Sequence, residues 1–310
     1  MIVTNENIRK SKKGKAYFAL ALTCIIWGTT WVASKVGVQD VPALSVSYIR
    51  QFIAGTILTV FYLIKKRSLP TPKQFGWLIM MAALMFMLAN GLSTWSVKYM
   101  SSGLGALIGA LYPLCVALIE IIFFKTKIKS ITLIGLFIGL AGVAIVFYEN
   151  TFYKQPEGYS FGIMLGLIAM FSWSIGTILI ARNKYNMDPY QALGWQMLIG
   201  SLLIYLMASV TGNTVALADI TPRTWLAIAY LIVMGSLIAF TAFIFTVKYL
   251  DPMLASIYAY INPIVAMLTG ALILKEELTI NLLIGAIITM TGVYIVNRSL
   301  RSEKMKEAES

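Results

Sequence analysis

The chain has 310 residues, of which 59% are hydrophobic and 12% are charged, and its mean hydropathy of +0.79 is positive. Globular domains carry about twice that share of charged residues, so the composition excludes a soluble domain. The net charge of +12 comes in short basic clusters between apolar runs, without a basic face, which favours membrane orientation over nucleic-acid binding.

Ten apolar runs follow one another along the chain, each long enough for a membrane-spanning helix, which needs about 20 residues. They cover residues 16–36, 42–64, 75–97, 102–124, 131–148, 159–181, 190–211, 224–247, 253–274 and 279–297. The pattern predicts an all-α integral membrane protein with ten transmembrane helices. The basic leader at 1–15 resembles the start of a signal peptide. The apolar run behind it is too long and lacks an A-x-A-like cleavage site, so we interpret it as the first span.

The basic residues predict how these spans are oriented. With the N-terminus in the cytoplasm, nineteen of the 25 Lys and Arg fall on the cytoplasmic side, four of them in the charged tail at 298–310. The positive-inside rule therefore favours a multi-pass protein of the cell (inner) membrane with both termini cytoplasmic. An odd number of spans would place the basic tail outside.

The sequence repeats itself at a shift of 150 residues. Val97-Lys98-Tyr99 returns as Val247-Lys248-Tyr249, and fifteen identities fall within the fifty positions 97–146 without a gap. An internal repeat of this length indicates two related halves.

The halves are residues 16–148 and 159–297, joined by an extracytoplasmic linker at 149–158. Because each half has five spans, an odd number, the second half must be inverted relative to the first. Inverted repeats around a central cavity are a transporter architecture.

Pro113 and Pro263 correspond in this repeat, and each lies about ten residues, or roughly 15 Å, into its span. A proline near the bilayer midplane removes a donor and clashes with the carbonyl four residues back, which predicts a kink and a freed carbonyl at Gly109 and Ala259. Such a carbonyl needs protein, water or a ligand as its partner. Both prolines are therefore candidates for lining or gating a cavity, with helix packing as the alternative.

Gly105 and Gly109 match Ala255 and Ala259 in the repeat. Small residues four apart let helix backbones approach closely. We interpret these positions as helix-packing faces rather than ligand contacts.

Ionisable side chains inside the spans are few. Arg50 should face the protein interior, water or a partner, and it either binds a substrate carboxylate or phosphate or caps carbonyls and fixes helix geometry. Glu120 lies only about 7 Å from the inner end of its span, so snorkelling to the interface competes with proton carriage, for which it is the ion-coupling candidate. Lys35, at the outer end of the first span, either snorkels or pairs with Asp40, and it is also a possible gate.

Aromatic and amide side chains at similar depths suggest an amphipathic pocket for organic solutes. With Arg50 they give eight substrate-binding candidates: Trp27, Arg50, Asn90, Tyr112, Trp173, Gln196, Tyr258 and Asn262. Similar depths also hold Trp31, Tyr48, Trp95, Trp195 and Tyr260. Packing or an interfacial aromatic belt is the alternative role for each.

Motifs for other chemistry are missing from the sequence. It has no G-x-x-x-x-G-K-[ST], no H-E-x-x-H and no histidine at all, the commonest metal ligand and catalytic base. Cys24 and Cys115 lie in apolar runs without metal-ligand spacing, which favours small buried hydrophobes. We expect no enzyme, no metal and no cofactor, and transport driven by a gradient of solute, protons or another ion. A non-transporting polytopic protein is the alternative from another class.

Three local patterns carry a resemblance. Trp27-Gly28-Thr29-Thr30-Trp31-Val32-Ala33-Ser34-Lys35 opens the first span, and Tyr48-Ile49-Arg50-Gln51-Phe52 lies in the second. The second half closes with Pro263, Lys275-Glu276-Glu277-Leu278-Thr279, Gly285 and Gly292-Val293. In this order they resemble the EamA family of the drug/metabolite transporter superfamily over nearly the whole chain. The first half departs from the family pattern at Thr126, where the glutamate would fall.

The resemblance implies a basket of helices around a central cavity, with the fifth and tenth spans peripheral and the binding residues on the other eight. It also implies a substrate that is an amino acid, a related metabolite or an amphipathic toxic compound, commonly exported. We therefore expect a secondary transporter that exports small metabolites by alternating access, with an uptake permease as the alternative.

Overall fold

The computed structural model describes residues 5–66, 69–125, 129–152, 157–182, 187–250 and 257–309, and these residues form helices and connecting turns with no strand among them. Among these described residues, eight helical segments are long and apolar enough to cross a membrane. Two shorter apolar helices, Ser130–Val146 and Tyr258–Leu274, lie where the sequence predicts the fifth and ninth spans. The structure therefore agrees with a polytopic all-α membrane protein. Judged by helix length and hydropathy, the described residues contain eight spans, whereas the sequence predicts ten.

The first half of the chain forms α1 Asn5–Asp40, α2 Ala43–Lys66, α3 Pro72–Met81, η1 Ala82–Gly91, α4 Leu92–Ser96, α5 Ser102–Gly109, α6 Tyr112–Phe124 and α7 Ser130–Phe152. The segments α3, η1 and α4 follow one another without a break and make up a single span, Pro72–Ser96. Helix α1 begins at Asn5, so most of the predicted leader continues the helix of the first span.

The second half forms α8 Tyr159–Arg182, α9 Pro189–Val210, η2 Leu217–Asp219, α10 Pro222–Tyr230, η3 Leu231–Ala239, α11 Phe240–Tyr249, α13 Tyr258–Thr269, η4 Gly270–Leu274 and α14 Ile280–Glu309. Here α10, η3 and α11 again make one span, Pro222–Tyr249. Both η1 and η3 are π-helical, at corresponding places in the two halves.

Helix starts and ends repeat at the 150-residue shift. Thr71 caps α3 with its side chain and is followed by Pro72, and Thr221 caps α10 in the same way before Pro222. Threonine at the N-cap and proline in the first turn are a favourable helix start. Lys125 and Lys275, also 150 apart, end α6 and η4 with φ values of 52° and 56°. The repeat seen in the sequence thus extends to local backbone conformation.

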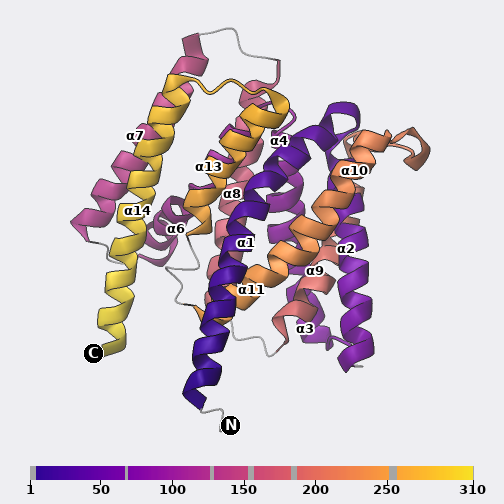
Figure 1. Cartoon of the computed structure of the whole chain (residues 1–310), viewed down its shortest axis with the longest axis horizontal. Coiled ribbons are helices and arrows are strands. Elements are labelled where there is room, and N and C mark those ends of the chain that lie inside the picture. The colour runs from indigo at the N-terminus through magenta and orange to yellow at the C-terminus, as the bar shows by residue number, and fades with distance from the viewer. Residues whose placement is uncertain are drawn as a thin grey trace.

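Two helix pairs are packed most extensively, α7 with α14 and α2 with α9. Figure 1 shows α7 and α14 side by side at one edge of the bundle. A Cβ at Gly292 would collide with the backbone of Gly139, and a Cβ at Gly142 with that of Thr289. Glycine is required here because the two backbones approach so closely.

Other extensive contacts also run between the halves. Helix α1 packs against α10, η3, α11 and α13, while α8 packs against η1, α4, α5 and α6. The start of α1 and the end of α14 lie at the same lower end of the view in Figure 1.

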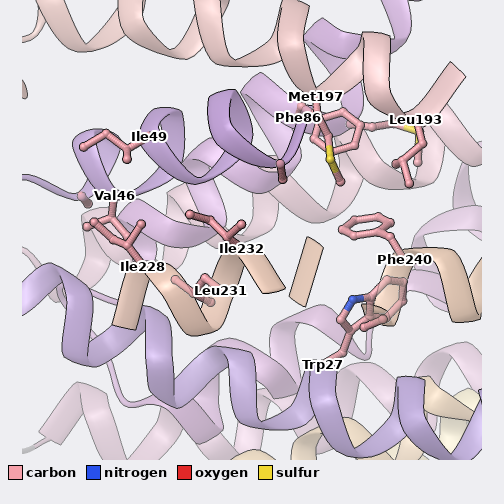
Figure 2. Close-up of a cluster of buried hydrophobic side chains, with 14 of the residues drawn as sticks. Trp27, Val46, Ile49, Phe86, Leu193, Met197, Ile228, Leu231, Ile232 and Phe240 are labelled. Atoms are coloured by element: carbon pink, nitrogen blue, oxygen red, sulfur yellow. The ribbon is translucent and has the colours of Figure 1, made fainter. Parts of the chain in front are cut away.

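The largest buried cluster joins α1, α2, η1, α9, η3 and α11. Figure 2 shows Phe86 and Met197 meeting near the top of this cluster, with Phe240 beside Trp27 below them. Apolar side chains are also exposed around the bundle, for example Phe18, Ile64, Phe137, Leu226 and Ile287. An exposed apolar surface of this extent suits contact with lipid.

Candidate functional site

A cavity of about 150 Å³ lies between the helices, walled by α1, α2, η1, α4, α5, α6, α8, α11 and α13. Both halves of the chain therefore contribute to its lining. A cavity of roughly this volume in another protein holds a benzene molecule, so the space suits a small organic solute. Among the described residues, α7 and α14 supply no lining residue.

Seven of the eight predicted substrate-binding residues line this cavity, namely Trp27, Arg50, Asn90, Tyr112, Trp173, Tyr258 and Asn262. The exception is Gln196, which is buried on α9, a helix that packs against α2, α3 and η1. Depth in the membrane predicted where Gln196 lies along the helix axis, but it carries no information on which face the residue occupies.

Arg50 is the one charged group among the described residues of the cavity wall. Its side chain is 6% exposed, and its Nε donates a hydrogen bond of 2.8 Å to the Ser236 hydroxyl on η3. A Cβ at Gly235 would lie 3.1 Å from the Arg50 Nη2, so the glycine leaves room for the guanidinium. Within the described part of the chain no carboxylate lies within ion-pair distance of Arg50, and its two terminal nitrogens have no hydrogen-bond partner.

An aromatic cluster forms one wall of the cavity. The Trp27 ring has its centroid 5.0 Å from Phe240, 5.0 Å from Phe243, 5.1 Å from Tyr258 and 6.5 Å from Trp173. The Trp27 indole N–H also donates to the Gly235 carbonyl at 3.4 Å. These contacts join α1, α8, α11 and α13, so the cluster closes the space between helices of both halves.

Asn262 links α13 to α1 beside this cluster. In the orientation that matches donors with acceptors, its amide nitrogen donates to the carbonyls of Tyr258 and Cys24, at 3.1 and 2.8 Å. The free thiols of Cys24 and Cys115 are both buried, as expected for small apolar side chains.

The two prolines shape their helices differently. The sequence predicts one kinked span at 102–124, whereas the structure ends α5 at Gly109 and starts α6 at Tyr112, so the chain breaks just before Pro113. Pro263 instead lies inside α13, which continues on both sides of it. Both prolines are buried and lie outside the lining, although Gly109 and Ala259, whose carbonyls they free, belong to it.

Gly105 and Gly109 form a flat surface under the Trp31 indole. A Cβ at Gly105 would lie 2.9 Å from Trp31 Cζ3, and one at Gly109 would lie 3.1 Å from Trp31 Cζ2. Both glycines pack against α1 in this way and also line the cavity. The interpretation of Gly105 and Gly109 as packing positions alone was therefore incomplete. Ala255, the repeat partner of Gly105, lies outside the described residues.

Lys35 lies beyond the cavity and ties its helix to the turn before α5. Its Nζ donates to the carbonyls of Met100, at 2.8 Å, and Lys98, at 3.3 Å. The alternative in which Lys35 pairs with Asp40 is not observed, because the Asp40 carboxylate instead accepts from the hydroxyls of Thr221 and Thr224. Lys35 and Asp40 are five positions apart on α1, so they do not face each other as residues three or four apart do.

Glu276 is a second contact at this end that the sequence missed. Its carboxylate accepts from the backbone N–H of Ser102, at 2.9 Å, and from the Ser102 hydroxyl, at 2.6 Å, and it attracts Lys35. A carboxylate at a helix N-terminus is stabilised by unpaired N–H groups and by the helix dipole. We call Lys35, Ser102 and Glu276 the polar lock. The sequence showed Lys35 as a possible gate and Glu276 as part of the family pattern, but it gave no signal that either lies near Ser102.

Glu120, the ion-coupling candidate, is half-buried on α6 and is not among the residues that line the cavity. The lining includes other polar residues that the sequence did not single out, Thr30, Ser34, Ser93 and Thr94. Serine and threonine are common at packed helix faces, so no pattern distinguished these four.

Comparison with known proteins finds the same family in each half of the chain. The model of the EamA-like transporter family matches residues 14–148 and again residues 160–298. The two matches coincide closely with the halves that the repeat defines.

Relatives from several bacteria resemble almost the whole chain. It is 29% identical to the uncharacterized transporter sll0355 of Synechocystis, over 95% of this chain and 92% of that protein. It is 28% identical to the uncharacterized inner membrane transporter YedA of Escherichia coli, over 89% and 91% respectively. The uncharacterized transporter YoaV of Bacillus subtilis is 25% identical, over 91% and 96%. One crystal structure superposes with a TM-score of 0.64 at 16% identity, covering 94% of this chain and 99% of the other, which shows a shared fold.

Proposed function

This chain belongs to the EamA-like transporter family, and from that premise we propose that it exports small metabolites, amino acids or related amphipathic compounds, across the cytoplasmic membrane. It does so as a secondary transporter, by alternating access. The observation that carries the proposal is the cavity of about 150 Å³ lined by helices of both halves. Its walls combine aromatic faces with a buried guanidinium, as binding sites for amphipathic organic solutes do.

The proposal includes ten spans in two inverted halves. It is supported by the exchange of contacts between the halves, since α1 packs on the span of α10 to α11 as α8 packs on the span of α3 to α4. The pairs α7–α14 and α2–α9 each join one span to its own repeat partner. Such an arrangement is expected if a two-fold axis in the membrane plane relates the halves. With ten spans, both termini lie on the cytoplasmic side, where the basic clusters favour them.

Two features suit opposite gates of the cavity. The polar lock joins α1, α5 and the segment after η4 on the side where Ser34 and Gly105 line the cavity. The aromatic cluster around Trp27 joins α1, α8, α11 and α13 on the side of Tyr258 and Phe240. Alternating access requires one of two such contacts to open while the other closes, and rigid-body rocking of the halves provides this movement.

In this scheme the seven lining candidates bind the solute. Gln196, Pro113 and Pro263 support the wall from behind, because all three are buried and none belongs to the lining. Export is preferred to uptake on the family resemblance alone.

The test is metabolite-resolved efflux from proteoliposomes loaded with a mixture of amino acids and organic acids, with protein-free liposomes as the control. We expect one class of solute to leave faster than from the control vesicles. A matched influx series with solute outside distinguishes an exporter from an uptake permease. If no solute moves under any solute, pH or sodium gradient, the transport proposal is wrong, and the non-transporting alternative gains support.

A further inference from the structure

We propose that the cavity selects solutes carrying a single carboxylate, and that Arg50 is the residue that binds this group. The inference rests on the proposed transport function and adds the substrate class to it. Its physical basis is a buried positive charge that has no counter-ion in the described part of the chain.

Arg50 is the only charged residue among the described residues that line the cavity. Burying an unpaired cation is costly, so buried arginines in membrane proteins face a partner of opposite charge or a water-filled space. The described part of the chain supplies no carboxylate within ion-pair distance. An anionic solute would provide the missing charge at the moment of binding.

The hydrogen bonds of the guanidinium fix which of its donors are available. Nε is used by Ser236, at 2.8 Å, while both terminal nitrogens are without a hydrogen-bond partner in the described chain. Two parallel N–H donors match the two oxygens of a carboxylate. A glycine at 235 keeps the space beside Nη2 free of a side chain.

Charge balance favours a carboxylate over a phosphate ester. A carboxylate at neutral pH carries one negative charge and neutralises Arg50. A phosphate monoester carries about −1.5 to −2 and would leave excess negative charge in a largely apolar space.

The other polar groups of the cavity tolerate an additional ammonium group but do not replace the carboxylate. Thr30 donates its hydroxyl hydrogen to the Trp27 carbonyl, at 2.6 Å, and Ser93 donates to the Asn90 carbonyl, at 3.1 Å. Their oxygens then retain only acceptor capacity, which suits an ammonium. Amino acids are therefore acceptable, whereas an amine without a carboxylate meets the positive charge of Arg50 uncompensated.

The test uses solutes that share one apolar body and differ only in the head group. The aromatic series is 3-phenylpropionate, phenylalanine, phenylalanine amide and 2-phenylethyl phosphate, and the aliphatic series is 4-methylvalerate, leucine and leucinamide. Flux is measured in proteoliposomes, and binding to detergent-solubilised protein is measured as thermal stabilisation. The variants are Arg50→Gln and Arg50→Lys. Arg223→Gln is the matched control, because Arg223 is an exposed residue of α10 outside the cavity.

We expect carboxylates to bind and move better than the matched amides by about tenfold, since hydrogen bonds to a charged group are roughly twice as strong as neutral ones. Arg50→Gln should remove this preference, Arg50→Lys should retain part of it because an ammonium lacks the planar fork, and Arg223→Gln should behave as the unchanged protein. The wild-type series and Arg50→Lys keep the test decisive if Arg50→Gln does not fold.

Equal binding of amides and carboxylates would overturn the inference. So would an Arg50→Gln variant that weakens both classes by the same factor, which would indicate a purely structural arginine. If carboxylates stabilise the protein but no solute moves, the transport proposal is wrong while this inference stands. If amides move and carboxylates neither bind nor move, transport stands and this inference is wrong.

Discussion

Glu276 and Ser102 are 174 positions apart in the sequence, yet the carboxylate of one caps the helix that the other begins. Both the backbone N–H and the hydroxyl of Ser102 donate to it, at 2.9 and 2.6 Å. Gly270 packs so closely on the pair that a Cβ there would collide with the Glu276 carboxylate and the Ser102 hydroxyl. The corresponding position of the first half is Thr126, so the residue type that makes this contact occurs in one half only.

Replacing Glu276 by Gln should therefore loosen one end of the cavity. The substitution removes a charged cap, which costs about 1–2 kcal/mol, and leaves a single amide oxygen to accept from Ser102. A cysteine at Ser93, on the cavity wall, reports the opening in a background without Cys24 and Cys115. We expect a polar thiol reagent to modify Cys at position 93 faster in the Glu276→Gln protein. Glu277→Gln, a change at the exposed neighbour, is the control and should leave the rate unaltered.

Trp27 should be the most sensitive position of the aromatic cluster. Trp27→Ala removes four ring contacts at once and leaves a hole in the cavity wall. Large-to-small changes of this kind cost about 3–5 kcal/mol, so the melting temperature in detergent should fall clearly. Trp27→Phe keeps an aromatic face and should lose much less. Equal melting temperatures for the Ala and Phe variants would contradict this role.

The α7–α14 contact predicts a loss of stability without a change in solute preference. Gly292→Ala places a methyl group against the backbone of Gly139 and should separate the helices, at a cost of about 1–3 kcal/mol. Gly76→Ala, with no atom within 4 Å of its added Cβ, should leave the stability unchanged or raise it slightly. Because the described parts of α7 and α14 do not line the cavity, flux ratios between solutes should be the same in both variants. A changed flux ratio in the Gly292→Ala protein would show instead that the α7–α14 contact influences the cavity.

Glu120 should not carry protons. It lies on α6 away from the cavity lining, so Glu120→Gln should leave both the solute flux and its response to an imposed pH gradient unchanged. The measurement is flux at three pH gradients in the original and changed proteins. A response that disappears in Glu120→Gln would restore it as the coupling group.

Apolar runs predicted the eight long spans of the described chain, because a helix in lipid must satisfy its own backbone and the run length fixes its extent. The sequence places the sixth span at 159–181 and the structure has Tyr159–Arg182. Both ends of this span fall at polar residues, so its bounds can be inferred directly from the sequence.

The sequence did not predict where the helices are interrupted or which face of each helix is turned toward its neighbours. The break before Pro113 follows from proline chemistry, but the same chemistry at Pro263 leaves α13 continuous, since surrounding helices decide whether a strained segment breaks. The π-helical segments η1 and η3 contain no proline, and the Gly235-Ser236 pair of η3 has no counterpart in η1, so no shared pattern marked them in advance. The sequence predicted depths for Gln196 and Lys35, but the contacts of each depend on helix rotation, which depth does not determine.

The central claim is that solutes pass through the cavity lined by both halves, and blocking it reversibly after folding tests this most directly. Ser93→Cys, without Cys24 and Cys115, is reconstituted, and efflux is measured before and after a bulky methanethiosulfonate reagent and again after reduction. Gly76→Cys, exposed on α3, is the matched control. We predict that modification at position 93 lowers efflux to that of protein-free liposomes and that reduction restores it, with no effect at position 76. Undiminished efflux from protein fully modified at position 93 would contradict the claim.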